Sequence, residues 1–352
     1  MIKFFRKIRQ SMINQNRTKK YLLYAIGEII LVVIGILIAL QVNNWNEERK
    51  KKTQIDQLLL DIEKDLISNY KTTNYTLDFY RKQDSLVRLI AAKKLTEEDY
   101  NANYNLRYLV SNWEYLIPKE KNINQFVESE KIVNAEYKPI IEAIKDIQYN
   151  KFALDDTWSN LDENIENNGK TLFLFNWFVK NDAISNAKAI DYFLNDESYE
   201  TLALAYWAKV QNYYDKVTRY RAQTMAALAT IKRVKYGYSN KAIIELFQQY
   251  NMQPFVNYGC DVESAELMNL KKRRASELYA NFTNETLYLN ITNNFSQPVA
   301  TIEITPNTFR TIPSSGYFGL DGDNNNLVKV IDERGHCINA YGAVENGYLI
   351  IE

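Results

Sequence analysis

The sequence predicts a mainly α-helical protein with an N-terminal transmembrane helix, an ectodomain that is an antiparallel bundle of long helices, and a small C-terminal β-sandwich-like domain. Three observations support this prediction. An almost uninterrupted apolar stretch covers residues 21–42, and apolar residues recur every three or four positions over 55–80 and 198–235. Near Leu287 the pattern changes to short strand-like runs separated by turn residues.

We expect five segments along the 352-residue chain. They are a basic cytoplasmic segment (1–20), the transmembrane helix (21–43), the helical ectodomain (44–255), a connector helix (256–280) and the β-domain (281–352). At about 1.5 Å per residue, the apolar helix spans roughly 30 Å, the thickness of a bilayer's hydrocarbon core. Because no small-residue cleavage site follows it, we expect an anchor rather than a signal peptide.

Charge around the apolar helix predicts its orientation. Seven Lys and Arg residues precede it and four follow it closely, so the N-terminus is expected in the cytoplasm and the bulk of the chain outside. Residues 1–52 carry a balance of +8 and the remainder −8. This split favours the lipid bilayer as a partner and argues against nucleic acid. Residues 2–13 fit either an interfacial amphipathic helix or a basic tail that only sets topology.

One face of the apolar helix is a candidate interface. Glu28, Val32, Gly35 and Ala39 fall on one stripe at about 100° per residue. An ionisable residue in a span is costly, and a small-xxx-small pair allows close helix approach. We therefore expect self-association or a membrane-protein partner here. The alternative is that Glu28 reaches the headgroup region or is protonated.

The stretch KYLLYAIGEIILVVIGILIALQVNNWNE, after the start MIKFFRKIR, resembles the N-terminal signature of an uncharacterised family of single-pass inner-membrane proteins of Gram-negative bacteria. The resemblance is mainly over residues 1–50 and is weaker at NWEYLIPKEKNINQFVES. It implies a bacterial inner-membrane protein with a helical periplasmic ectodomain. It implies no activity, cofactor or catalytic residue.

Local signals mark where helices begin and end. Thr96 and Asp99 have the spacing of an approximate capping box, and Pro139 suits a helix start before a helical pattern over 140–165. We expect a turn or break at Asn167–Gly169. Two later helices are expected at about 198–235 and 241–250.

Four runs in the C-terminal part have strand character: LYLNIT, VATIEI, LVKVID and GYLII. They predict a β-domain near the lower size limit for an independent core. It should therefore depend on the helices or on a disulfide. Cys260 and Cys337, the two cysteines, suit such a disulfide, worth about 3–4 kcal/mol in the chain-entropy model. The alternative is two buried thiols.

A weak calcium-loop pattern is formed by Asp321, Asp323, Asn325 and Asp332. The sequence departs from the pattern because Asn326 replaces the expected glycine and Asp332 the expected glutamate. A polar hairpin turn explains the same residues without metal. We therefore expect no metal and no cofactor.

The chain lacks familiar catalytic signatures. His336 is its one histidine, and no phosphate-binding, dinucleotide or nucleophile-elbow motif occurs. We expect a non-enzymatic, membrane-anchored envelope protein that binds a protein or glycan. The alternative is a sensor or modulator that acts on a membrane partner through the transmembrane helix. An enzyme that uses carboxylates alone is the third hypothesis.

Overall fold

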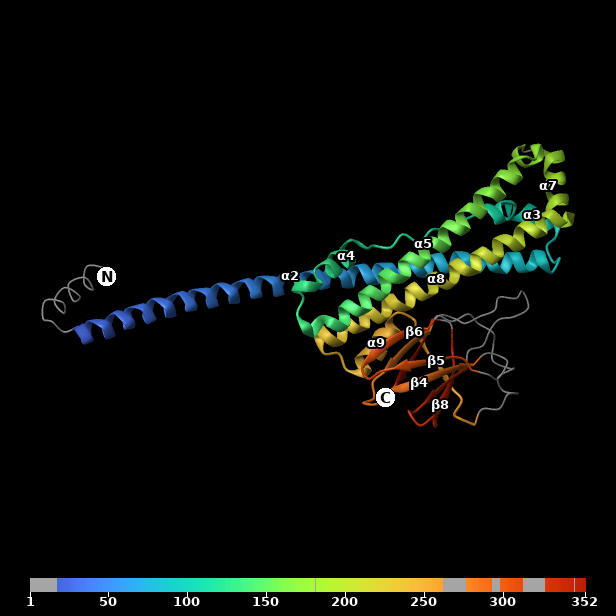
Figure 1. The fold of residues 1–352 in the computed structure, drawn as a ribbon. Helices are drawn as coiled ribbons and strands as arrows, with labels where there is room; N and C mark the ends of the chain where they lie inside the picture. Colours follow the sequence, from blue (N-terminus) through green and yellow to red (C-terminus); the bar gives the residue numbers. More distant parts are fainter. Residues whose placement is uncertain (1–17, 181, 262–276, 293–297, 313–326, 345) are drawn as a thin grey trace. The chain divides into compact units, whose positions relative to one another are not determined.

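The computed structural model describes residues 18–180, 182–261, 277–292, 298–312, 327–344 and 346–352 (Figure 1). These residues are mainly helical, and the C-terminal part is rich in strands. Internal contacts divide the chain into two compact units, residues 1–58 and 59–352. The amphipathic segment expected at 2–13 lies outside the described residues.

Helix α2 runs without interruption over Thr18–Ala91. From Ile26 to Val42 its side chains are exposed, except that of Glu28, which is half-buried. In the described part of the chain, this is the one helix long and apolar enough to cross a membrane. The expected apolar N-terminal helix is therefore present, and its orientation stays a prediction.

The later part of α2 is amphipathic. Its buried side chains recur every three or four residues along much of its length, as expected for one apolar helical face. They are fully or almost fully buried at Leu59, Ile62, Leu66, Tyr70 and Leu77. This face packs within the second unit.

Several shorter helices lie between α2 and the two remaining long helices. They are α3 (Glu97–Ala102), η1 (Tyr104–Ser111), α4 (Lys121–Glu128), η2 (Glu130–Ile132) and η3 (Ala135–Tyr137). The capping box expected at Thr96 is present, because its side chain accepts from the Asp99 N–H and the Asp99 carboxylate accepts from the Thr96 N–H.

Helices α5 (Lys138–Phe173) and α8 (Glu197–Tyr236) pack along each other (Figure 1). Helices α6 (Asn176–Val179) and α7 (Ala183–Asn195) connect them, and α9 (Asn240–Gln249) follows. The prediction that Pro139 suits a helix start is confirmed, since it occupies the first turn of α5. Gly237 ends α8 with a left-handed φ of 68°, which glycine adopts without steric cost.

The contacts of α8 define the direction of its neighbours. Hydrogen bonds join its successive residues Gln211, Tyr220 and Lys232 to Asp84, Asn69 and Glu63 of α2. Residue numbers rise along one helix as they fall along the other, so α2 and α8 are antiparallel. Asn150–Gln223 and Trp158–Tyr213 contacts show the same relation for α5 and α8.

The turn expected at Asn167–Gly169 is wrong, because α5 continues through it to Phe173. Asn168 is buried there, and its Nδ2 donates to the Val110 carbonyl at 2.9 Å. This tertiary contact, together with the buried Leu172 one turn later, outweighs the weak helix propensity of Asn and Gly.

The strands form two sheets. The first has the order β1-β9-β3-β6 and the second β2-β8-β7-β4-β5. The strands are β1 (Gln253–Pro254), β2 (Val256–Asn257), β3 (Glu277–Asn281), β4 (Leu287–Thr292), β5 (Pro298–Ile304), β6 (Thr308–Ile312), β7 (Leu327–Ile331), β8 (Cys337–Gly342) and β9 (Gly347–Ile351). β9 is parallel to β1 and β3, whereas the other described pairs are antiparallel.

One apolar cluster includes side chains from both sheets, with Tyr279 and Leu349 from the first and Leu289, Ile304 and Val330 from the second. The four strand-like sequence runs correspond to β4, β5, β7 and β9. The cluster therefore gives the strand-rich region an apolar core of its own.

The expected connector helix over 256–280 needs correction at both ends. Residues 256–257 form β2, which pairs with β8, and residues 277–280 belong to β3, which pairs with β6 and β9. Residues 262–276 lie outside the described residues. The strand-rich region therefore takes strands from before residue 281, because β1 and β2 complete the two sheets.

Candidate functional site

A cleft of about 340 Å³ lies between α5, α8 and β6. Its size falls within the usual range of small-ligand sites. It is lined by Pro139, Glu142, Ala143 and Asp146 of α5, by Gln223, Ala226, Thr230, Arg233 and Val234 of α8, and by Asn307, Thr308, Phe309, Arg310 and Thr311. We refer to it below as the β6 cleft.

The floor of the β6 cleft comes from the most enclosed part of α8. Every side chain from Tyr220 to Ile231 is buried, which shows that this part of the helix is covered on all sides. Strands β3 and β6 are among the elements that contact α8. Small side chains at Ala226 and Thr230 let the sheet approach the helix while leaving a hollow between them.

The α5 wall carries two acidic side chains. Glu142 and Asp146 are four residues apart and therefore lie on the same side of the helix. Both remain exposed to solvent. Burial by surrounding atoms raises the pKa of Asp146, and the positive charges of Arg310 and Arg219 oppose this shift.

The wall at β6 is fixed by Arg233. Its Nη1 donates to Asn240 Oδ1 at 2.7 Å and its Nη2 to Asn307 Oδ1 at 3.2 Å. Its guanidinium lies 3.9 Å from the ring centroid of Phe282. Arg233 thus attaches the turn before β6 to α8. Burial lowers its pKa, but an arginine stays charged at neutral pH.

A second polar feature is residues 112–120, which we call the strap. The strap has no regular secondary structure, yet side chains of α2 and α8 bind its backbone. The Tyr80 hydroxyl donates to the Glu114 carbonyl at 2.9 Å and accepts from the Glu114 N–H at 3.2 Å. The Tyr213 hydroxyl accepts from the buried Leu116 N–H at 2.9 Å. These hydroxyls replace the strand partner that the strap lacks.

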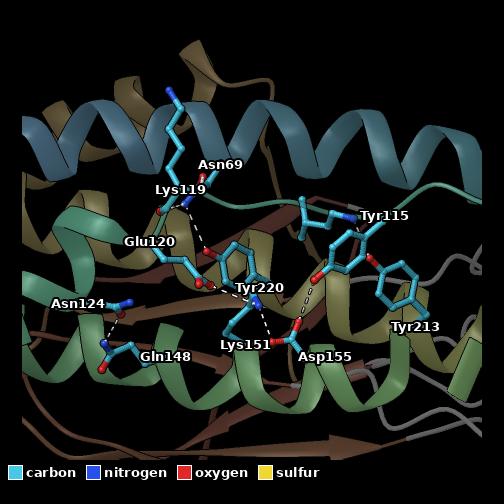
Figure 2. A network of polar contacts seen from close by, with 11 residues as sticks. Asn69, Tyr115, Lys119, Glu120, Asn124, Gln148, Lys151, Asp155, Tyr213 and Tyr220 are labelled. Carbon is cyan, nitrogen blue, oxygen red and sulfur yellow. Dashed lines mark hydrogen bonds and ion pairs between the residues drawn. The ribbon is translucent and has the colours of Figure 1, made fainter. Parts of the chain in front are cut away.

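Asn69 completes this arrangement further along the strap (Figure 2). Its Oδ1 accepts from the Lys119 N–H at 2.7 Å, and its Nδ2 donates to the Lys119 carbonyl at 3.0 Å. The same Nδ2 lies 3.3 Å from the Tyr220 hydroxyl. At the other end, the Tyr206 hydroxyl donates to the Asn112 carbonyl at 2.9 Å.

Lys151 lies beside the strap, next to a small cavity of about 120 Å³ (Figure 2). Its Nζ is 3.5 Å from Glu120 and also forms an ion pair with Asp155. Burial lowers the pKa of Lys151, but the hydrogen bond to Asp155 and the two negative charges outweigh burial and raise it. Lys151 therefore stays charged, which suits an ion pair and not a nucleophile.

The predicted stripe lies on the apolar part of α2. Val32 is 55% exposed, and a Cβ atom added at Gly35 would meet nothing within 4 Å. Gly35 and Ala39 are exposed, as the expected interface requires. A partner for this stripe stays a prediction.

Asp321, Asp323 and Asn325 of the calcium pattern lie outside the described residues. Asp332 is described, and it closes the turn between β7 and β8. Its carboxylate accepts from the backbone N–H groups of His336 at 2.8 Å and Arg334 at 2.9 Å, and these bonds lower its pKa. Among the described residues, no group of three or more His, Cys, Asp or Glu side chains is arranged to hold a metal.

The two cysteines lie together in the structure. Cys260 and Cys337 form a disulfide with their Cα atoms 6.0 Å apart. It joins the segment after β2 to the first residue of β8. His336, directly before Cys337, is exposed and its Nδ1 is 3.1 Å from Asp332. The histidine therefore belongs to a surface turn.

These features define a mainly helical protein with one candidate membrane-spanning helix among its described residues and a strand-rich region beside the β6 cleft. The profile of a family of unknown function (DUF6090) matches residues 28–154. The match supports a resemblance to an uncharacterised family, over a segment that begins at Glu28 and includes the strap. No curated protein and no solved structure matches the chain.

The β6 cleft was not predicted from the sequence. Its acidic side chains belong to a helix pattern that predicts a solvated face, and β6 itself, with the sequence TFRTI, was not among the four predicted strands. A signal is present, since Thr, Phe and Ile favour strands and follow the turn-forming Pro306-Asn307. The packing of this strand against α8 cannot be predicted from the local sequence.

Proposed function

We propose that this protein is a non-enzymatic binding protein anchored in the bacterial inner membrane. Its N-terminus is cytoplasmic and the residues beyond the span are periplasmic. The apolar part of α2 and the excess of basic residues before it support this placement. The disulfide also suits an oxidising compartment.

In this proposal the long helices form an antiparallel bundle that carries a β-sandwich. The antiparallel contacts of α8 with α2 and α5 support the bundle. The apolar cluster shared by two sheets supports the sandwich. The bundle positions α8 so that its small side chains meet β6 and create the β6 cleft.

The β6 cleft is the observation that carries the proposal. It combines apolar surface with amide, hydroxyl, acidic and basic groups, which is typical of sites that bind polar ligands. Its lining residues include no histidine, cysteine or lysine. We propose that the ligand is a protein or a glycan. The amide, hydroxyl and charged groups of the cleft would hold it by hydrogen bonds and ion pairs, without a chemical reaction.

The first experiment measures binding by the full-length protein in lipid nanodiscs to arrays of peptides and oligosaccharides. We expect one class to bind, and Arg310→Glu to weaken binding by reversing a charge in the cleft. The matched control is Arg334→Glu in the β7–β8 turn, which lies outside the cleft lining. Equal binding by both variants, or none by the wild type, contradicts the proposal.

The alternative is a sensor or modulator that acts on a membrane partner through the stripe Glu28, Val32, Gly35 and Ala39. The open surface beside Gly35 favours this reading. In-cell crosslinking of the full chain and of Gly35→Leu separates the two. Loss of one membrane partner in Gly35→Leu, with Arg310→Glu unaffected, favours the modulator.

A further inference from the structure

Strand β6 presents an edge to the β6 cleft. It is the last strand of its sheet and, in the part of the chain that the structure describes, it pairs with β3 alone. The consecutive residues Asn307 to Thr311 all line the cleft. Neighbouring side chains of a strand point to opposite faces of the sheet. Consecutive residues of one strand can therefore line the same cleft when the cleft lies along the edge of that strand. Such an edge carries unpaired backbone N–H and C=O groups.

The cleft also holds charges of both signs in reach of that edge. Glu142 and Asp146 lie on the α5 side and Arg310 on the β6 side. None of the three has a hydrogen bond or ion pair with another described residue, although Arg310 acts electrostatically on Asp146. The cleft therefore offers both an acidic pair and a basic group to a ligand.

We propose that the β6 cleft binds an extended polypeptide segment of a partner, which adds as a strand to the open edge of β6 and places a basic group near Asp146 and an acidic group near Arg310. This inference rests on the proposed function and names its ligand class. Main-chain hydrogen bonds to β6 supply affinity, and the charged pairs define direction and register.

Three properties favour a polypeptide over a glycan or a lipid headgroup. A strand edge repeats donors and acceptors at the spacing of another peptide backbone, which a sugar lacks. Charges of both signs suit a chain with basic and acidic side chains, whereas a phosphate group would be repelled by Glu142 and Asp146. The cleft is open to solvent and lies along a strand, so a longer chain is free to extend beyond it.

The test uses full-length protein in lipid nanodiscs and a random-sequence library of short peptides. The tightest-binding peptide is then synthesised with and without backbone N-methyl groups at alternate residues. We expect N-methylation to weaken binding at least tenfold, because it removes the donors that a strand needs. Hydrogen exchange should slow, when the unmodified peptide is bound, at the backbone amides of residues 308–312 that point away from β3.

Charge variants test the orientation of the peptide. We expect Asp146→Asn and Arg310→Gln each to weaken binding by about fivefold, since each removes a partly exposed ion pair worth up to about 1 kcal/mol. The matched control is Glu163→Gln, an exposed glutamate on the same helix that lies outside the cleft lining. It should leave affinity unchanged.

The outcomes separate this inference from the proposed function. If an oligosaccharide binds in the cleft and no peptide protects β6, the proposed function stands and strand addition is wrong. If a peptide binds but protects another edge, such as β5, the inference is also wrong. If neither ligand class binds, both proposals fail.

Discussion

The helical core and the strand-rich core satisfy their buried groups in different ways. Large fully buried side chains of the helical part include Tyr80, Tyr199, Tyr206, Tyr213 and Tyr220. The strand-rich core is mainly aliphatic, and among its cluster residues Tyr279 is the one tyrosine that is fully buried. The sheets bond their own backbone through ladders. The helices instead use tyrosine hydroxyls to bond the backbone of the strap, as with Tyr80 and Tyr213.

This difference predicts that high pH destabilises the helical part before the strand-rich region. We expect this to be the largest of the effects considered below. Burial raises the pKa of Tyr100 to about 12, and it raises the pKa values of Tyr80, Tyr206, Tyr213 and Tyr220 still further. A raised pKa in the folded state gives stability that is complete below pH 10 and is lost as pH rises toward the folded pKa. Between pH 10 and the pKa of the folded state, each such tyrosine lowers the free energy of unfolding by about 1.4 kcal/mol per pH unit.

We therefore expect cooperative unfolding of the helices between about pH 10 and 12. Far-ultraviolet circular dichroism and phenolate absorbance should change together. Gradual ionisation of all tyrosines near pH 10, with helix retained, would show that the hydroxyls are not protected by the fold.

Loss of the disulfide should destabilise the strand-rich region and leave the helical part stable. The bond closes a loop of 77 residues, so removing it costs about 4 kcal/mol in the chain-entropy model. We expect the double variant Cys260→Ser, Cys337→Ser to expose the strand-rich region to protease while the helices keep their thermal transition. Wild-type protein treated with reductant is the matched comparison and should behave identically. An unchanged protease pattern would mean that the ladders and apolar cluster suffice.

A single hydroxyl of the helical core can be removed by Tyr213→Phe. This change leaves the buried Leu116 N–H without its acceptor and should lower the free energy of unfolding by about 2 kcal/mol. Chemical denaturation measures the loss. Tyr149→Phe, on the exposed surface, is the control and should change little. Equal effects of the two substitutions would argue that a water molecule replaces the Tyr213 hydroxyl as the acceptor for the Leu116 N–H.

The smallest expected effects come from a glycine-to-alanine substitution made once in the strand-rich region and once in the helical part. Gly347→Ala places a Cβ 2.5 Å from the Val344 carbonyl oxygen and 2.6 Å from Phe255 Cε1, and should destabilise the strand-rich region by about 1 to 2 kcal/mol. Gly169→Ala in α5 meets its nearest atom at 3.9 Å and should stabilise the helix by about 0.5 to 1 kcal/mol. Thermal melts of the two variants should shift in opposite directions. Shifts of the same sign would refute the contrast.

The sequence predicted elements with strong periodicity and missed features that depend on distant segments. The apolar part of α2 and the stripes through Tyr206, Tyr213 and Tyr220 follow from local spacing, and these tyrosines are buried. The hydroxyls of Tyr206 and Tyr213 bond to the strap, roughly a hundred residues earlier in the chain, and that of Tyr220 bonds to Asn69 of α2. Local spacing does not reveal these partners. The helix through Asn168 was missed for the same reason, since its partner Val110 is remote.

The β6 cleft shows the same limit. Glu142 and Asp146 look like a solvated helix face, and Arg310 lies in a short run that was not predicted as a strand. Their proximity results from the packing of β6 on α8, which depends on small side chains such as Ala226 and Thr230. Local patterns predict each element, whereas a site built from three elements needs the tertiary fold.

The strap has a consequence for how the length of this chain can vary. Its backbone is bound at Asn112, Glu114, Leu116 and Lys119 by side chains that project from rigid helices. Inserting or deleting one residue between Asn112 and Lys119 would move every later N–H and C=O group away from its partner, as a register slip does in a sheet. Relatives that share this strap should therefore keep its length constant and accept length changes outside it.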